Sequence, residues 1–329
     1  MCIENMTNRL KKIGFILLKL LITLSILSYL VYKADFSAIN QLLLKIDILL
    51  FCLSFIIIIS RDIFLAMRWK ILLAFHNNHF SSLLLTQYYY ISAFFSLFLP
   101  TAVGGDIVRW YYLHDNGIKH NHALSSILYE RFLGIISLIF FASFSFFVDF
   151  EMAGSDVIKI TMVMILFLCL ASFVTFWHFH RLLKWKWLAK ILSRFKSIVK
   201  FIENIKDYSQ NMRVVIVCLI LSLIAQLMGI LAVYLIALSL GSSVNFLYFI
   251  VFLPIVWLVS MIPISIGGLG LREGAFVLLF MSIGMPKEMA IAISALILLQ
   301  IIAHGMLGGI IFLFFQKGSL KEFQNEISN

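Results

Sequence analysis

The chain alternates between long apolar segments and short polar ones. An apolar segment of about 20 residues forms a helix about 30 Å long, which matches the hydrocarbon core of a membrane. Six segments reach this length, and each is expected to cross the membrane once: 13–31, 48–66, 123–148, 158–179, 214–239 and 289–315. A shorter segment, 35–47, predicts a helix at the membrane surface. The pattern therefore predicts an all-α polytopic membrane protein.

Two further apolar segments contain the same interruption. Residues 100–109 read PTAVGGDIVR and residues 263–272 read PISIGGLGLR, and both fit the pattern P-x3-G-G-x3-R. The matching residues are Pro100, Gly104, Gly105 and Arg109 in the first copy and Pro263, Gly267, Gly268 and Arg272 in the second. Proline removes a helix donor, and paired glycines allow positive φ and close backbone approach. We therefore expect a helix break at each copy, with these prolines and glycines and Gly270 as hinges. A chance match of four positions is the alternative explanation.

The basic residues are unevenly placed along the chain. Nine of the 26 Lys and Arg residues lie between Arg181 and Arg213, whereas the link 149–156 is acidic. Cytoplasmic loops carry the Lys and Arg excess, so 181–213 and the N-terminus are expected inside and 149–156 outside. Apolar residues recur at helical spacing among these charges, which predicts that 181–212 is an amphipathic helix on an anionic membrane surface. A plain cytoplasmic connector is the alternative, and nucleic acid is not an expected partner.

The same charge rule decides how the first interrupted segment is placed. If 83–99 crossed the membrane completely, the nine-charge segment would lie outside. If the chain instead enters, breaks and returns as 106–114, the rule is satisfied. We therefore predict that 83–114 is a re-entrant hairpin from the cytoplasmic side. Three crossings separate the two copies, so 246–283 is predicted to be a second hairpin that enters from outside.

These expectations give one membrane domain, 1–329, built from two halves. The first half is about 13–148 and the second about 158–315, with both chain ends in the cytoplasm. Inverted repeats with broken helices that meet near the membrane midplane are typical of transporters.

Arginines follow both interruptions and predict a phosphate-binding cavity. The helix that restarts after each break presents free N–H groups and the positive end of its dipole, which favour an anion. Arg109 and Arg272 add forked donors that suit phosphate. The alternative is that the interruptions are tight turns whose arginines reach the membrane surface.

Other charged residues within the apolar segments fit such a cavity. Glu130 and Arg131 lie within the span 123–148, and Asp106 and Glu273 accompany the arginines of the two interruptions. Ionisable groups at this depth are costly and usually pair or line a pathway. The set holds three acids and three arginines, so a purely structural ion-pair network is the rival interpretation.

The remaining polar residues in apolar segments are expected to serve the structure. Four residues near the end of the span 48–66 are expected to anchor it at the cytoplasmic surface: Arg61, Asp62, Arg68 and Trp69. The mid-span residues Gln226 and His304 are expected to form hydrogen bonds between helices.

Composition supports the membrane class and argues against an enzyme. Hydrophobic residues make up 62% of the 329 positions, charged residues make up 13%, and the mean hydropathy is +1.02. No P-loop, G-x-S-x-G, H-E-x-x-H or kinase motif is present, so we expect neither catalysis nor a cofactor, although an ion gradient could drive transport. The histidines at 114–122 and the four cysteines show no ligand spacing, so no metal is expected.

Three stretches in this order resemble the lysylphosphatidylglycerol synthase transmembrane-region family, also called the flippase-like domain family: FFSLFLPTAVGGDIVRWYYL, YERFLGI and MIPISIGGLGLREGAF. The resemblance covers about residues 10–315. The family's Pro-Gly-Gly-Asp-Arg motif maps onto Pro100, Gly104, Gly105, Asp106 and Arg109, its Glu-Arg pair onto Glu130 and Arg131, and its Gly-Gly-x-Gly-x-x-Glu motif onto Gly267, Gly268, Gly270 and Glu273. The resemblance implies an inner-membrane protein whose relatives translocate lysyl-phosphatidylglycerol or are linked to polyprenyl- or dolichol-linked sugars and hopanoid-type lipids. The 329 residues lack the aminoacyl-transferase domain of the full synthases, so lysine transfer is not implied.

The sequence therefore predicts a flippase or transporter for an anionic lipid or lipid-linked substrate, such as a polyprenyl phosphate or phospholipid, in the bacterial cytoplasmic membrane. Three arginines are expected to hold the phosphate, namely Arg109, Arg131 and Arg272. Three acids are expected to position them or exchange protons, namely Asp106, Glu130 and Glu273. The alternatives are a membrane-embedded transferase acting on a lipid phosphate and a non-transporting accessory subunit of an envelope lipid or glycan pathway. The oligomeric state is left open.

Overall fold

The fold is known from a computed structural model that describes residues 18–26, 28–29, 32, 34–99, 104–143, 207–208, 211–262 and 264–328, with side chains up to Phe315. The regular elements of these residues are all helices. They are α2 (Phe36–Leu44), α3 (Ile48–Phe75), α4 (Ser82–Phe98), α5 (Gly104–Asp115), α6 (His120–Ser143), α11 (Met212–Ser239), α12 (Phe246–Ser260), α13 (Leu271–Met281) and α14 (Lys287–Ser328). The expected all-α class is confirmed.

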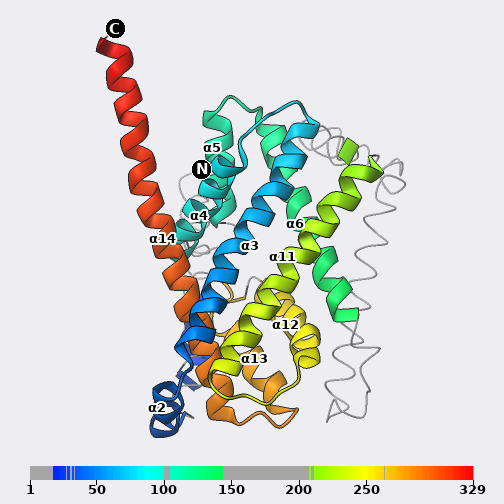
Figure 1. Cartoon of the computed structure of the whole chain (residues 1–329), viewed down its shortest axis with the longest axis vertical. Helices are drawn as coiled ribbons and strands as arrows, with labels where there is room; N and C mark the ends of the chain where they lie inside the picture. The colour runs from blue at the N-terminus through cyan, green and yellow to red at the C-terminus, as the bar shows by residue number, and fades with distance from the viewer. Residues whose placement is uncertain are drawn as a thin grey trace, which may run out of the picture.

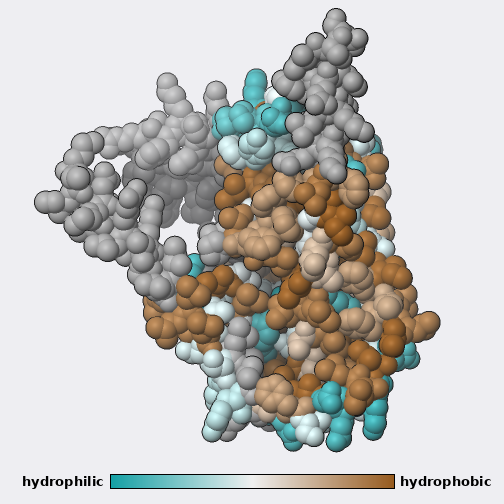
Figure 2. Space-filling model, turned by 90° about the vertical axis from the view of Figure 1, so that its left-hand side faces the viewer, coloured by the Kyte–Doolittle hydropathy of each residue, from teal (hydrophilic) through white to brown (hydrophobic). Residues whose placement is uncertain are grey.

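Four helices are long and apolar enough to cross a membrane: Ile48–Phe75, His120–Ser143, Met212–Ser239 and Lys287–Phe315. They correspond to four of the six expected spans. The span expected at 13–31 is described only in part. The span expected at 158–179 lies outside the described residues, and so does almost all of the basic segment 181–212. Hydrophobic residues cover most of the middle of the face shown in Figure 2, and hydrophilic residues gather at its two ends. The protein is a multi-pass membrane protein.

Short polar residues set the starts of several helices. The side chains of Asp47 and Asn245 accept hydrogen bonds from the backbone N–H groups of Leu49 and Leu247, each at 2.9 Å. Ser81 does the same for Leu84 at 3.1 Å. These caps satisfy N–H groups that the first turn of a helix leaves without a partner.

The order of helices repeats along the chain. A long helix (α3) is followed by two short ones (α4 and α5) and a long one (α6), and α11 to α14 follow the same order. In Figure 1 the pair α4–α5 lies in the upper half of the molecule and the pair α12–α13 in the lower half. Helices of 12 and 11 residues, as in α5 and α13, are only about 18 Å and 17 Å long and cannot cross the hydrocarbon core. Re-entry of 83–114 and 246–283 into the membrane stays a prediction.

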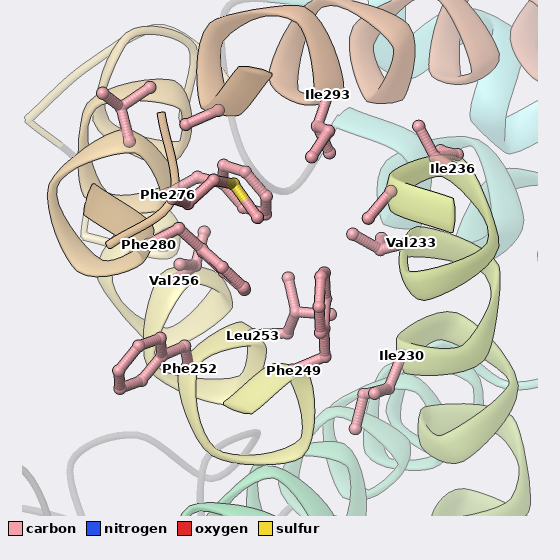
Figure 3. Packing of buried hydrophobic residues seen from close by; sticks show 14 of the residues in the cluster. Ile230, Val233, Ile236, Phe249, Phe252, Leu253, Val256, Phe276, Phe280 and Ile293 are labelled. Carbon is pink, nitrogen blue, oxygen red and sulfur yellow. The ribbon is translucent and has the colours of Figure 1, made fainter. Parts of the chain in front are cut away.

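Two of the hydrophobic clusters lie mainly within the two sets of four helices. Phe249, Leu253 and Phe280 pack in a cluster that also takes residues from α11 and α14 (Figure 3). A second cluster joins α3, α4, α5 and α6 around Trp69, Leu85 and Ile127. Four of the six charged residues expected to form the site lie beside this second cluster.

Candidate functional site

Four of the six expected site residues meet between α5 and α6. The guanidinium of Arg109 lies 2.7 Å from Oε2 of Glu130 and also forms an ion pair with Asp106, which lies one turn earlier on α5. Arg131 pairs with the other oxygen of Asp106. Asp106 and Arg109 can pair because residues three apart on a helix share a face. The adjacent residues Glu130 and Arg131 of α6 point to different partners, Glu130 to Arg109 and Arg131 to Asp106.

Two further residues, which were not expected at the site, donate hydrogen bonds to Glu130. Arg68 of α3 donates to Oε1 of Glu130 at 2.8 Å and to the hydroxyl of Ser222 on α11 at 2.7 Å. The hydroxyl of Tyr89 on α4 also donates to Glu130. Glu130 therefore receives hydrogen bonds from three different helices, α3, α4 and α5. We call Arg68, Asp106, Arg109, Glu130 and Arg131 the arginine cluster.

The expectation that Arg68 and Trp69 anchor a helix end at the membrane surface is wrong. The first long helix runs to Phe75 and not to residue 66, so both residues lie within it, with exposed fractions of 6% and 0%. The signal was present in the sequence, because no proline or glycine separates 66 from 75. Asp62 is buried as well, and it lies 3.3 Å from Arg61 and 2.9 Å from His304 of α14. His304 therefore contacts a second helix, but among the described residues its Nε2 lacks the well-directed hydrogen bond that was expected there.

Aromatic rings surround the central arginine. The guanidinium carbon of Arg109 lies 4.5 Å from the ring centroid of Tyr89 and 5.0 Å from that of Trp69. The Trp69 indole donates to Ser126 at 3.2 Å, which fixes the orientation of its ring. The attraction between a cation and an aromatic face is stronger at a site that is shielded from water. The site thus holds Arg109 by two carboxylates and two rings.

Burial and charge differ among the members of the cluster. The side chains of Arg68 and Arg109 are each 7% exposed and that of Glu130 is 2%, whereas that of Arg131 is 31% exposed. The nearby carboxylate of Asp62, which pairs with Arg61, interacts electrostatically with Arg109 and Glu130. Together with Arg61 and Asp62, the arginine cluster makes a group of four arginines and three carboxylates. These seven described residues carry one excess positive charge, and Arg131 is the most exposed member of the arginine cluster.

Arg272 and Glu273 do not join this cluster. Their described side-chain contacts are with each other and with the backbone N–H of Gly270, which donates to Glu273 at 2.6 Å. Glu273 therefore caps the start of α13, and Asp106 likewise lies in the first turn of α5. The helix starts that were expected to favour an external anion each hold a carboxylate of the protein. Binding of a ligand by any of the six residues stays a prediction.

The glycines of the two interruptions act differently. Gly267, Gly268 and Gly270 have φ values of 59°, 78° and 82°, as expected for a break that needs left-handed backbone. Gly104 and Gly105 instead begin α5 with helical backbone, and they allow close approach. A β-carbon on Gly105 would lie 2.8 Å from the carbonyl oxygen of Ser92 on α4. Pro100 and Pro263 lie outside the described residues, and a hinge role for any of these positions stays a prediction.

A groove runs along the opposite face of α5. It has a volume of about 540 Å³ and is lined by aromatic and aliphatic residues of α4, α5 and α14, among them Phe95, Ile107, Tyr111 and Phe312, with Asp115 also in its wall. One short helix therefore presents Arg109 to the cluster and an apolar groove to its other side. In the part of the chain that the structure describes, no group of three or more His, Cys, Asp or Glu could hold a metal.

The fold and the site define a multi-pass helical membrane protein with a buried, arginine-rich polar centre. Comparison with known proteins is more specific: residues 16–316 match the model of the family described as the lysylphosphatidylglycerol synthase TM region. The chain therefore belongs to this family, as its motifs indicated. It is also similar to the UPF0104 membrane protein PH1989 of Pyrococcus horikoshii, with 22% identity over 322 residues, which cover 90% of this chain and 96% of that protein. No solved structure matches the chain.

Proposed function

We propose that this protein is a transporter, and not an enzyme, that moves an anionic lipid or lipid-linked substrate across the cytoplasmic membrane. The substrate class is a lipid with a phosphate in its head, such as a phospholipid or a polyprenyl phosphate. The observation that carries this proposal is the group of arginines and carboxylates that several helices bring together around Glu130, with Arg131 31% exposed at its edge. A charge within the membrane is costly unless it has a partner or a function.

The head group would reach the cluster at Arg131. This arginine is the accessible member of the cluster, and its partner Asp106 also binds Arg109. A phosphate that pairs with Arg131 would compete for an arginine with Asp106, so binding and release would be coupled to the position of α5. The apolar tail would lie in the bilayer or in the groove on the other face of α5.

The family supports a lipid-related function. The name of the family refers to the membrane region of a lipid-modifying synthase. The name of the relative from Pyrococcus horikoshii says only that it is a membrane protein. The fold agrees with transport, because two short helix pairs in opposite halves of the molecule fit a transporter built from inverted repeats.

The test is lipid movement by the purified full chain in vesicles. Vesicles of phosphatidylethanolamine and phosphatidylglycerol would carry a trace of fluorescent phosphatidylglycerol, and quenching from outside would report its transfer between leaflets. A charged hydrogen bond contributes about 1.5–3 kcal/mol, so Arg131→Gln should lower the affinity for the lipid roughly ten- to a hundredfold. The matched control is Arg213→Gln, because Arg213 is exposed at the start of α11.

Stability measurements separate this proposal from a structural ion-pair network. If the cluster only holds the helices together, Arg131→Gln should lower the melting temperature, Asp106→Asn should restore it, and lipid affinity should not change. That outcome would contradict a lipid-binding role. Native mass spectrometry of the protein with co-purified lipids identifies the substrate independently.

A further inference from the structure

A second buried polar contact lies apart from the proposed head-group site. Nε2 of His304 on α14 lies 2.9 Å from Oδ2 of Asp62 on α3. The two residues are 7% and 2% exposed. The nitrogen has no well-directed hydrogen bond, so we read the short distance as an electrostatic contact whose strength depends on the charge of the imidazole. Neither residue is proposed to bind the lipid head group, although Asp62 interacts electrostatically with Arg109 and Glu130 of the arginine cluster.

The ionisable groups described around His304 come from several helices. On α3, Arg61 lies 3.3 Å from the other oxygen of Asp62. On α4, the ring of Tyr90 lies 5.3 Å from the imidazole, but its hydroxyl donates to the carbonyl of Ile59 at 2.9 Å. From α5 and α6, Arg109 and Glu130 interact electrostatically with Asp62. On α14 itself, the neighbour one turn earlier is the neutral Gln300, which donates to Ser54 of α3.

Histidine is the side chain that gains and loses a proton near neutral pH. A proton on His304 would place a second cation beside Asp62, which already faces Arg61. The same carboxylate contributes to the field at Arg109, so a proton at His304 would weaken the hold of Asp62 on the arginine cluster. Its charge would therefore be felt where the lipid phosphate is proposed to bind.

Helix α14, which carries His304, also packs closely against α4 of the pair α4–α5. A β-carbon on Gly305 would lie 2.4 Å from a side-chain atom of Leu97, and one on Gly308 would lie 1.8 Å from the carbonyl oxygen of Tyr90. Helices α14 and α4 are therefore in close contact in the turn that follows His304. A movement of α14 relative to α3 would move α4 and, with it, the start of α5.

We propose that His304 and Asp62 form a proton-binding site that couples a proton gradient to movement of the lipid. The proton binds to the imidazole and leaves it again, with no other bond formed or broken. The proposal rests on the proposed function and adds its energy source.

The first experiment uses the same vesicles with a pH difference across the membrane. For one proton moved per lipid, a difference of one pH unit should change the steady-state ratio of lipid between leaflets by about tenfold. His304→Gln should abolish this response while lipid exchange without a gradient continues. The matched control is His79→Gln, because His79 is exposed outside the helices. Lipid movement by the wild type that ignores the gradient, or a gradient response retained by His304→Gln, would overturn the proton site and leave the proposed function intact.

The second experiment needs no lipid transport, so it decides the case even if none is seen. Cysteines at Ser54 and Gln300, whose side chains are in contact, would report the α3–α14 contact by oxidative cross-linking of the full chain, with its native cysteines replaced. Yield would be compared at about pH 5.5 and about pH 8, on either side of the pKa at which an unperturbed histidine titrates. Thiols react faster at higher pH in every variant, so the proposal expects the wild type and His79→Gln to share one pH dependence of the yield and His304→Gln to show a different one. The same pH dependence in all three proteins would overturn it, whereas failure of lipid movement alone would overturn only the proposed function.

Discussion

Single residues show how this protein keeps charge inside a membrane. Glu130 accepts hydrogen bonds from Arg68, Tyr89 and Arg109, so its charge is shared among three helices. Burial of an ion is tolerated when the geometry satisfies it, and removal of one partner then leaves an uncompensated charge. The cost of a substitution in the cluster therefore depends on which partners remain.

Arg68 should be a major contributor to stability. Arg68→Gln removes a partner from Glu130 and a donor from Ser222, and such a loss at a buried pair costs about 3–5 kcal/mol. Glu130→Gln should cost less in the Arg68→Gln background than in the wild type, because the two changes remove the same interaction. Unfolding in detergent of both single variants and the double variant measures this. Additive effects would show that Arg68 and Glu130 do not interact.

The glycines after α12 allow a direct comparison of strain and crowding. Gly268 and Gly284 have similar φ values, 78° and 88°. A β-carbon on Gly268 would lie 2.7 Å from the carbonyl oxygen of Ser260, whereas one on Gly284 would meet nothing within 4 Å. Both changes to alanine cost about 1–2 kcal/mol for left-handed backbone, and Gly268→Ala should cost more because Ser260 must move. Melting temperatures in detergent test this, and equal losses would show that the close approach is unimportant.

At the scale of helices, contacts between small residues and polar side chains hold the two halves together. The glycines of α14 admit α4, and Gln300 and His304 of α14 reach α3 through Ser54 and Asp62. Helices in a membrane associate through close contact of small residues and through hydrogen bonds, since lipid tails are as apolar as leucine. Helix α14 therefore joins the second half to the first, as does α11, whose Ser222 accepts a hydrogen bond from Arg68 of α3.

Gly308→Ala should destabilise the protein although alanine favours helices. A β-carbon at 308 would overlap the carbonyl of Tyr90, and overpacking of this kind costs about 1–3 kcal/mol. Gly134→Ala is the control, because the space around Gly134 is open, and alanine there should stabilise α6 by up to about 1 kcal/mol. Thermal unfolding of both variants distinguishes the two effects. A neutral Gly308→Ala would show that α14 and α4 can separate at no cost.

At the scale of the whole molecule, the turns between helices gather at two opposite ends of the helix bundle. The turns at 116–119 and 76–81 and the C-terminus lie at the upper end in Figure 1, and the turn at 282–286 lies at the lower end. The start of α11 at Met212, which follows the basic segment, also lies at the upper end. Because the basic segment comes directly before Met212 in the sequence, the positive-inside rule predicts that this end faces the cytoplasm.

Cysteine labelling tests this topology. On a cysteine-free background, Lys119→Cys should be protected from an impermeant reagent added to intact cells, and Pro286→Cys should react. His79→Cys is the control for the upper end and should behave as Lys119→Cys does. Labelling of Lys119→Cys from outside would contradict both the orientation and the first re-entrant hairpin.

The class of the protein could be predicted from sequence because the hydrophobic pattern is local. Apolar runs of sufficient length predicted four spans that the structure describes, and the two interruptions fall between α4 and α5 and between α12 and α13. The motifs around Asp106, Glu130 and Glu273 were specific enough to indicate the family. These features depend only on neighbouring residues, so one sequence contains them.

Only the tertiary structure decided which charges meet. Arg68 was assigned to the membrane surface because its helix was expected to end at 66, and its contact with Glu130 depends on how α3 is rotated against α6. Arg109 and Arg272 have identical positions in the repeated pattern, yet one joins a cluster drawn from several helices and the other pairs with its neighbour Glu273. Spacing along the chain predicts that a charge is inside the membrane, but its partner is set by the rotation and crossing of helices distant in sequence.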